Sequence, residues 1–167
     1  MAILPLTQFP LAALRRAADA VSDATAPFIG ALVRDLRETM LAANGIGLAA
    51  PQVGVALRVI VVKTDDGWLG LINPVIVESS HRWESGEEGC LSIPGVFGLV
   101  RRSFRIRVTA RSPVGEPVRF ATEGLLARVL QHEVDHLNGI LFIDRLDRFT
   151  AGNDRLRELW RAVEPRG

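Results

Sequence analysis

Two long stretches of the chain repeat their apolar residues at the spacing of an amphipathic helix. The apolar stripe of the first stretch consists of Ile29, Leu32, Val33, Leu36 and Met40. This pattern predicts a helix over residues 28–43, and Pro27 suits its first turn. The second stretch repeats Leu125, Leu126, Val129, Leu130 and Leu137. It predicts a helix from about 122 to 138, with Gly139 in the position of a C-terminal cap.

Alternating residues and short apolar runs predict β-strands in the middle of the chain. The expected strands cover 57–62, 69–77, 104–111 and 118–121. Pro74 interrupts the second of these strands, because proline has no N–H to donate to a sheet. Turn residues at 65–67 predict a hairpin, and those at 112–116 predict a further turn.

The remaining stretches lack a clear period. Prolines break up residues 1–27, small residues over 45–54 predict a connector, and the polar residues 84–95 predict a loop or an irregular sheet edge. A last helix is expected after Asn153, and its apolar residues are Leu156, Leu159, Trp160 and Val163. We predict an α+β fold in which mixed or antiparallel sheets pack around the helix over 122–138, within a single domain spanning 1–167.

Composition and charge restrict the class of protein. The chain has 48% apolar and 23% charged residues, which is typical of a globular protein and not of a disordered one. A net charge of +1 gives no bulk attraction to DNA or to a membrane surface. No apolar run reaches the roughly 18 residues of a membrane span, and no secretory signal is recognisable. The single cysteine suits a reducing compartment, so we expect a cytoplasmic protein that binds neither DNA nor membranes.

The second predicted helix contains the sequence His132-Glu133-Val134-Asp135-His136. Histidines four residues apart lie on one face of a helix, where both can bind the same metal ion. Glu133 is about 100° away around the helix, which is a poor position for a ligand and a good one for moving a proton. His-Glu-x-x-His therefore indicates metal-assisted hydrolysis.

Two histidines do not complete a tetrahedral site, so a further ligand must come from elsewhere. Cys90 is the only cysteine of the chain and its only soft ligand. A zinc endopeptidase would take a ligand downstream of the helix, where the chain has Glu158 and Glu164 but no histidine after His136. A structural metal module would need a fourth protein ligand, for which only His81 remains.

Three stretches, residues 45–54, 87–95 and 131–139, follow one another in a specific order. They contain Gly-Ile-Gly-Leu-Ala-Ala-Pro-Gln, Glu-Gly-Cys-Leu-Ser and Gln-His-Glu-Val-Asp-His-Leu, and they resemble the three signature motifs of peptide deformylase. The likeness continues into 141–146 and covers most of the chain. It implies an enzyme that removes the N-formyl group from the formyl-methionine of nascent polypeptides and releases formate.

The resemblance also implies how the metal site is built. Cys90 is expected to be the third metal ligand beside His132 and His136, which leaves one position for water. Glu133 is expected to accept a proton and to deliver it to the leaving amine. Iron(II) is the implied metal in the cell, and zinc, nickel or cobalt also suit these ligands.

The resemblance implies further roles in binding. The side-chain amide of Gln52 and the backbone N–H of Leu91 would hold the oxyanion. The residues expected to bind the formyl-methionine end of the peptide are Ile46, Gly47, Gly89, Leu125 and Val129. Nascent chains are the implied partners, together with a weak ribosome contact through the C-terminal helix. Arg128 and Phe97 differ from residues common in the family, which leaves the peptide preference beyond methionine open.

Overall fold

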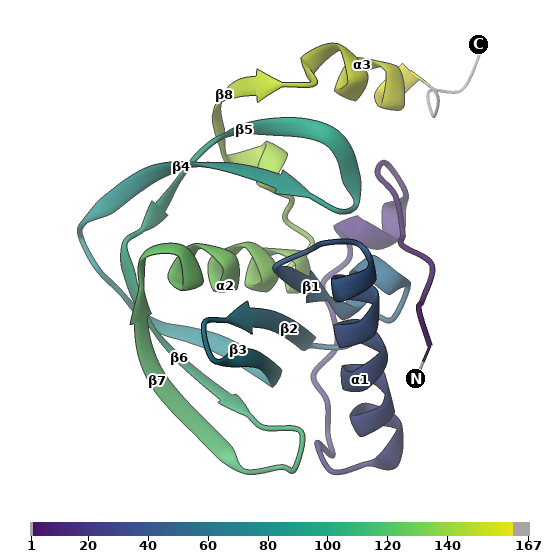
Figure 1. Cartoon of the computed structure of the whole chain (residues 1–167), viewed down its shortest axis with the longest axis vertical. Helices are drawn as coiled ribbons and strands as arrows, with labels where there is room; N and C mark the ends of the chain where they lie inside the picture. The colour runs from purple at the N-terminus through teal and green to yellow at the C-terminus, as the bar shows by residue number, and fades with distance from the viewer. Residues whose placement is uncertain (1, 162–167) are drawn as a thin grey trace.

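The computed structural model describes residues 2–161 of the chain (Figure 1). Its α-helices in that range are α1 (Pro27–Ala42), α2 (Gly124–Leu137) and α3 (Asn153–Arg161). The first strands are β1 (Gly47–Ala49), β2 (Val59–Thr64), β3 (Gly67–Ser79) and β4 (Trp83–Cys90). They are followed by β5 (Ile93–Ser103), β6 (Arg105–Arg111), β7 (Pro117–Glu123) and β8 (Leu146–Ala151). Short 3₁₀ helices cover Ala12–Arg15, Ala50–Val53 and Phe142–Arg145.

The strands form two antiparallel sheets with α2 between them (Figure 1). The larger sheet has the order β1-β2-β3-β6-β7, and the smaller has the order β4-β5-β8. Helix α2 contacts β1, β2 and β3 of the larger sheet and β5 of the smaller one. The α+β fold with antiparallel sheets around a central helix is thus confirmed.

Apolar packing holds α2 in this position. Leu130 and Leu137 are fully buried and pack with Ile60, Val62 and Val108 of the larger sheet. Burying a leucine side chain contributes about 1.5–3 kcal/mol, so a few such contacts fix the orientation of the helix. Helix α1 packs against β1 and β2 of the same sheet and buries its apolar stripe with Val59 and Val61 of β2 in a second cluster.

Most of the predicted elements are present with shifted ends. The helices expected over 28–43 and 122–138 are α1 and α2, and Pro27 is the first residue of α1. The hairpin at 65–67 joins β2 to β3. The pairing of β3 with β6 shifts its register between Ile72 and Val75, around Pro74. Gly139 has φ 71°, as its capping position requires. Val163, expected in the last helix, lies outside the described residues.

Two segments differ from expectation. The connector over 45–54 contains the edge strand β1 and a 3₁₀ turn. The loop interpretation of 84–95 is wrong, because this segment is the hairpin of β4 and β5, while the alternative of a sheet edge is right. Polar and glycine residues give no alternating pattern here, and pairing with β5 stabilises the strand instead. Strands β5 and β8 were not predicted. Among the described residues, no helix is both long and apolar enough to span a membrane.

Candidate metal centre and active site

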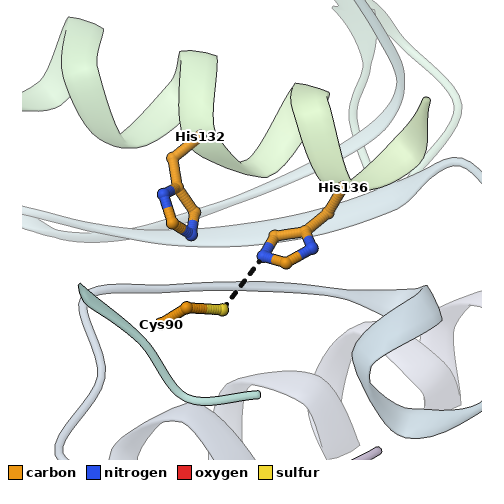
Figure 2. Close-up of side chains that lie close together, drawn as sticks. All are labelled: Cys90, His132 and His136. Atoms are coloured by element: carbon orange, nitrogen blue, oxygen red, sulfur yellow. Dashed lines mark hydrogen bonds between the residues drawn. The ribbon is translucent and has the colours of Figure 1, made fainter. Parts of the chain in front are cut away.

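Three side chains from two elements meet at the inner face of α2. His132 and His136 lie one turn apart on the helix, and Cys90 is the last residue of β4 (Figure 2). One ligand atom from each lies within 4.8 Å of the others, and Cys90 Sγ is 3.3 Å from Nε2 of His136. The register of β4 and β5 shifts between Gly89 and Cys90, and such an irregularity re-aims a side chain. The cluster therefore depends on both the helix and the hairpin.

This cluster fits a divalent transition metal. Sulfur and nitrogen ligands at tetrahedral angles around zinc are about 3.5 Å apart, close to the Cys90–His136 separation. Nδ1 of His132 lies 2.9 Å from Oε2 of Glu88, which leaves Nε2 for a metal. Three protein donors of this kind suit zinc or iron(II) and keep one coordination position open.

The alternative ligands do not join the cluster. His81 is exposed, and Glu158 is exposed on α3, where it pairs with Arg155. Within residues 2–161 the histidine, cysteine and carboxylate side chains give only the group of Cys90, His132 and His136. Glu164 lies outside the described residues. A site closed by four protein ligands and a site completed from downstream of the helix are both disfavoured.

A chain of buried charges lies behind the histidines. Arg102 donates to both oxygens of Glu88, at 3.0 and 2.9 Å, and also to Asp135. Asp135 accepts two further hydrogen bonds from Arg145. Burial alone would raise the pKa of Glu88, but hydrogen bonds from His132 and Arg102 lower it to about 2. Glu88 is thus a carboxylate that holds the far side of the His132 ring.

Glu133 lies at the pocket wall in a tight apolar position. Its side chain is buried, and no group within residues 2–161 forms a hydrogen bond with its Oε2. Burial raises the pKa of Glu133 to about 7. Gly47 of β1 makes room for it, since a Cβ there would overlap Oε1 of Glu133 and lie 2.9 Å from Cγ1 of Val129. A carboxyl group in this state can both accept and release a proton near neutral pH.

Gln52 is fixed at the other side of the cluster. It lies in the 3₁₀ turn after β1, and its Oε1 accepts a hydrogen bond from the backbone N–H of Ala49 at 2.8 Å. Nε2 of Gln52 is therefore directed towards Ser92 Oγ, at 3.3 Å, and Cys90 Sγ, at 3.5 Å. Leu91 follows Cys90 in the turn between β4 and β5.

A pocket of about 500 Å³ opens onto these residues. The predicted residues that line it are Ile46, Gly47, Gln52, Gly89, Cys90, Leu91, Leu125, Val129, His132 and Glu133. His136 lies deeper and is 1% exposed. Leu125 and Ile46 are exposed at the rim, whereas Val129 is buried in the wall. All the sequence-predicted site residues thus come together.

Sequence reasoning missed several residues of the site. Asp135 and Arg102 complete the buried charges, and neither was predicted to take part. Asp135 is buried next to His136 on the helix, and a helical projection of the sequence could have shown this position. Arg102 lies on the unpredicted strand β5, so no local pattern pointed to it. Arg128 and Phe97 also line the pocket, and only the resemblance had drawn attention to them.

The fold and the site define a class of protein. An open site with one sulfur and two nitrogen donors, a glutamate with a free oxygen and an adjoining pocket are the parts of a mononuclear metal-dependent hydrolase. The family model "Polypeptide deformylase" matches residues 3–151. The chain belongs to the polypeptide deformylase family. It is an enzyme, a metal-dependent hydrolase that removes the N-formyl group from nascent polypeptides.

Individual relatives agree with this assignment. The peptide deformylase of Desulfitobacterium hafniense is 46% identical over 145 residues, covering 87% of this chain and 95% of the relative. The Thermotoga maritima peptide deformylase structure has a TM-score of 0.86 at 40% identity and covers 89% of this chain and 100% of its own. A structure of the Acinetobacter baumannii enzyme with Met-Ala-Ser bound has a TM-score of 0.82 at 37% identity. The match covers 87% of this chain and 99% of that one.

Proposed function

We propose that Cys90, His132 and His136 hold the catalytic metal and that Glu133 moves the proton when formyl-methionine peptides are deformylated. The observation that carries the proposal is the cluster of Cys90, His132 and His136, of which Cys90 and His132 line the pocket together with Glu133. A divalent metal held there would polarise the formyl oxygen and lower the pKa of a water molecule. Every other step is assigned to side chains and backbone groups of the chain itself.

Glu133 is the proposed general base and then the general acid. Its free Oε2 can take a proton from the attacking water, and the same oxygen can pass it to the amine that leaves. A pKa of about 7 suits both roles, because each needs a proton affinity close to the working pH. Gly47 leaves the space that this carboxyl group occupies, because a Cβ there would overlap its Oε1.

The proposed oxyanion donors are Nε2 of Gln52 and the backbone N–H of Leu91. The Ala49 N–H fixes the carbonyl end of the Gln52 amide, so its NH₂ group is preorganised towards the cluster. Preorganised donors stabilise the developing negative charge without having to reorient during the reaction. Leu91 follows Cys90 directly, so its N–H lies next to the proposed ligand.

The pocket supports methionine as the first residue of the peptide. Leu125 and Val129 lie four residues apart on α2 and provide an apolar wall, with Ile46 at the rim. Gly47 and Gly89 have no side chain to fill the pocket, and each belongs to an edge strand. Both therefore offer backbone groups to an extended peptide. The Acinetobacter baumannii relative with Met-Ala-Ser bound supports this assignment.

We further propose iron(II) as the metal in the cell, the cytoplasm as its location and a weak ribosome contact through α3. The S/N/N donor set accepts iron(II) as well as zinc, nickel or cobalt. Arg155 and Arg157 expose cationic groups on α3 that could contact ribosomal RNA phosphates. Salt-sensitive co-sedimentation with ribosomes tests the contact, and its absence at low salt would refute it.

The decisive experiment is formate release from formyl-Met-Ala-Ser. Protein reconstituted with iron(II) without oxygen is compared with Glu133→Gln, which should retain one metal per chain. We expect formate from the wild type and a loss of about 100-fold or more in kcat for the variant. A variant with most of the wild-type rate would refute the role of Glu133. No formate from metal-loaded wild type would refute the substrate.

A further inference from the structure

We propose that Arg128 is a positioning residue: its guanidinium ties strand β4 to helix α2 and thereby sets the position of Cys90 relative to the two histidines. The proposal rests on the proposed function of this site. Arg128 has no proposed contact with the reacting atoms, since its hydrogen bonds run to Glu84, Glu88 and Val100 of the smaller sheet.

The contacts of Arg128 join helix α2 to both β4 and β5. It lies one turn before His132 on α2, and its side chain is 13% exposed. Nη1 donates to the carbonyl of Val100 on β5 at 2.8 Å, and Nη2 donates to the carbonyl of Glu84 on β4 at 2.7 Å. Nη1 also reaches the carbonyl of Gly86 at 3.4 Å. A planar guanidinium can serve several acceptors at once, whereas the compact ammonium of lysine cannot span them.

The same guanidinium holds the carboxylate that orients His132. Nη1 of Arg128 donates to Oε1 of Glu88 at 2.9 Å, and Oε2 of Glu88 lies 2.9 Å from Nδ1 of His132. Arg102 contacts both oxygens from the direction of β5. With Arg102 alone the carboxylate could tilt about this pair of contacts. The second guanidinium opposes the tilt, so the imidazole keeps its direction towards the metal position.

The backbone opposite Arg128 is shaped to receive it. A Cβ at Gly86 would lie 2.8 Å from Cζ of Arg128 and 2.9 Å from Nε and Nη2. Gly86 does not have the positive φ that requires glycine, so an alanine there is compatible with the backbone. The space at Gly86 is therefore needed by the guanidinium. Substituting Gly86 offers a way to displace Arg128 without removing it.

The first test measures the geometry of the metal site and its retention of metal, without catalytic turnover. The cobalt(II) forms of wild type, Arg128→Met, Arg128→Lys and Gly86→Ala are compared, with Arg101→Met, an exposed β5 arginine, as the matched control. The cobalt absorption bands report ligand geometry, and transfer of cobalt to a chelator reports retention. We expect Arg128→Met to lose cobalt about tenfold faster with shifted bands, and Arg128→Lys and Gly86→Ala to change in the same direction by less. Arg101→Met should match the wild type.

Kinetics with formyl-Met-Ala-Ser complete the test. We expect Arg128→Met to lower kcat about tenfold while KM stays within about twofold. A higher KM with unchanged kcat and cobalt bands would make Arg128 a substrate-binding residue and overturn the proposal. A lower Tm without any change in the cobalt bands or in the rate of cobalt loss would make Arg128 a stabilising residue only. That outcome would also overturn the proposal. If Arg128→Met does not fold, Arg128→Lys and Gly86→Ala decide. Absence of formate from the wild type would refute the proposed function, while the cobalt measurements would still decide the role of Arg128.

Discussion

Single side chains of this site are oriented by a hydrogen bond at the atom that faces away from the proposed metal position. His132 is held through its Nδ1 by Glu88, and Gln52 is held through its Oε1 by Ala49. In each case the anchored atom determines where the remaining donor or ligand atom points. Glu133 is the opposite case, because its Oε2 has no hydrogen-bond partner in the part of the chain that the structure describes, which suits its proposed role in proton transfer.

The proposed ligand role of Cys90 predicts a linked loss. Cys90→Ala removes the only thiolate of the three-atom cluster, so metal affinity and formate release should fall together by at least about 100-fold. Metal content after gel filtration is measured beside activity. The wild type should also lose thermal stability when a chelator removes its metal, since metal binding stabilises the folded state. Cys90→Ala should show no such change in Tm, and a full metal content in this variant would contradict its role.

At the scale of elements, helix α2 has two apolar surfaces with different functions. Leu130 faces the larger sheet and is fully buried, whereas Leu125 lies at the pocket rim and is 67% exposed. The first surface fixes the helix in the molecule, and the second is available to a substrate. The same helix presents its histidines to Cys90, so small changes in its packing reach the metal site.

The two leucines provide a matched pair of substitutions. Leu130→Ala should lower the free energy of unfolding by about 2–5 kcal/mol, because it leaves a cavity in a packed core. Leu125→Ala should cost less than about 0.5 kcal/mol and should raise KM for formyl-Met-Ala-Ser about fivefold. Urea unfolding and steady-state kinetics measure the two effects. Equal stability losses would contradict the assignment of Leu125 to the pocket.

At the scale of the whole molecule, buried charges connect the smaller sheet to α2. Glu88 on β4 and Arg102 on β5 form a pair whose side chains are each 5% exposed, and Arg102 continues to Asp135 on the helix. Removing one partner of such a pair leaves an uncompensated charge, which is costly. The connection therefore fixes the smaller sheet against the helix at the point where Cys90 meets the two histidines.

The lowered pKa of Glu88 predicts a pH-dependent stability. Its folded value of about 2 lies below the ordinary value of 4.5, so its contribution is complete above about pH 4.5 and is lost as pH falls through about 2. Glu88→Gln should cost about 3 kcal/mol near pH 7, and the difference from the wild type should shrink towards pH 2. Urea unfolding at pH 7, 4 and 2.5 measures it, with the neighbouring exposed Glu87→Gln as control. A difference that is constant with pH would contradict the prediction.

Elements that depend on neighbouring residues could be predicted from the sequence alone. The apolar period over 28–43 and 122–138 predicted α1 and α2, because a helix brings residues three and four apart onto one face. The same geometry placed His132 and His136 together, and the turn residues at 65–67 predicted the hairpin. Cys90 was already the only soft ligand in the sequence. The resemblance assigned it to the same site as the histidines and added the pocket residues, which no local pattern could have joined to the helix.

The contacts between distant side chains could not be predicted without the folded structure. The register of β4 and β5 brings Cys90 to the histidines and Glu88 to Arg102, although β4 lacks an alternating pattern and β5 was not predicted. Packing of α2 between two sheets brings Arg128 to the carbonyls of β4. Strand pairing and packing between elements depend on complementarity along the whole chain, whereas residue periodicity acts over a few residues. The residue types that could bind a metal can therefore be recognised in the sequence, whereas the fold determines how these residues are arranged in space.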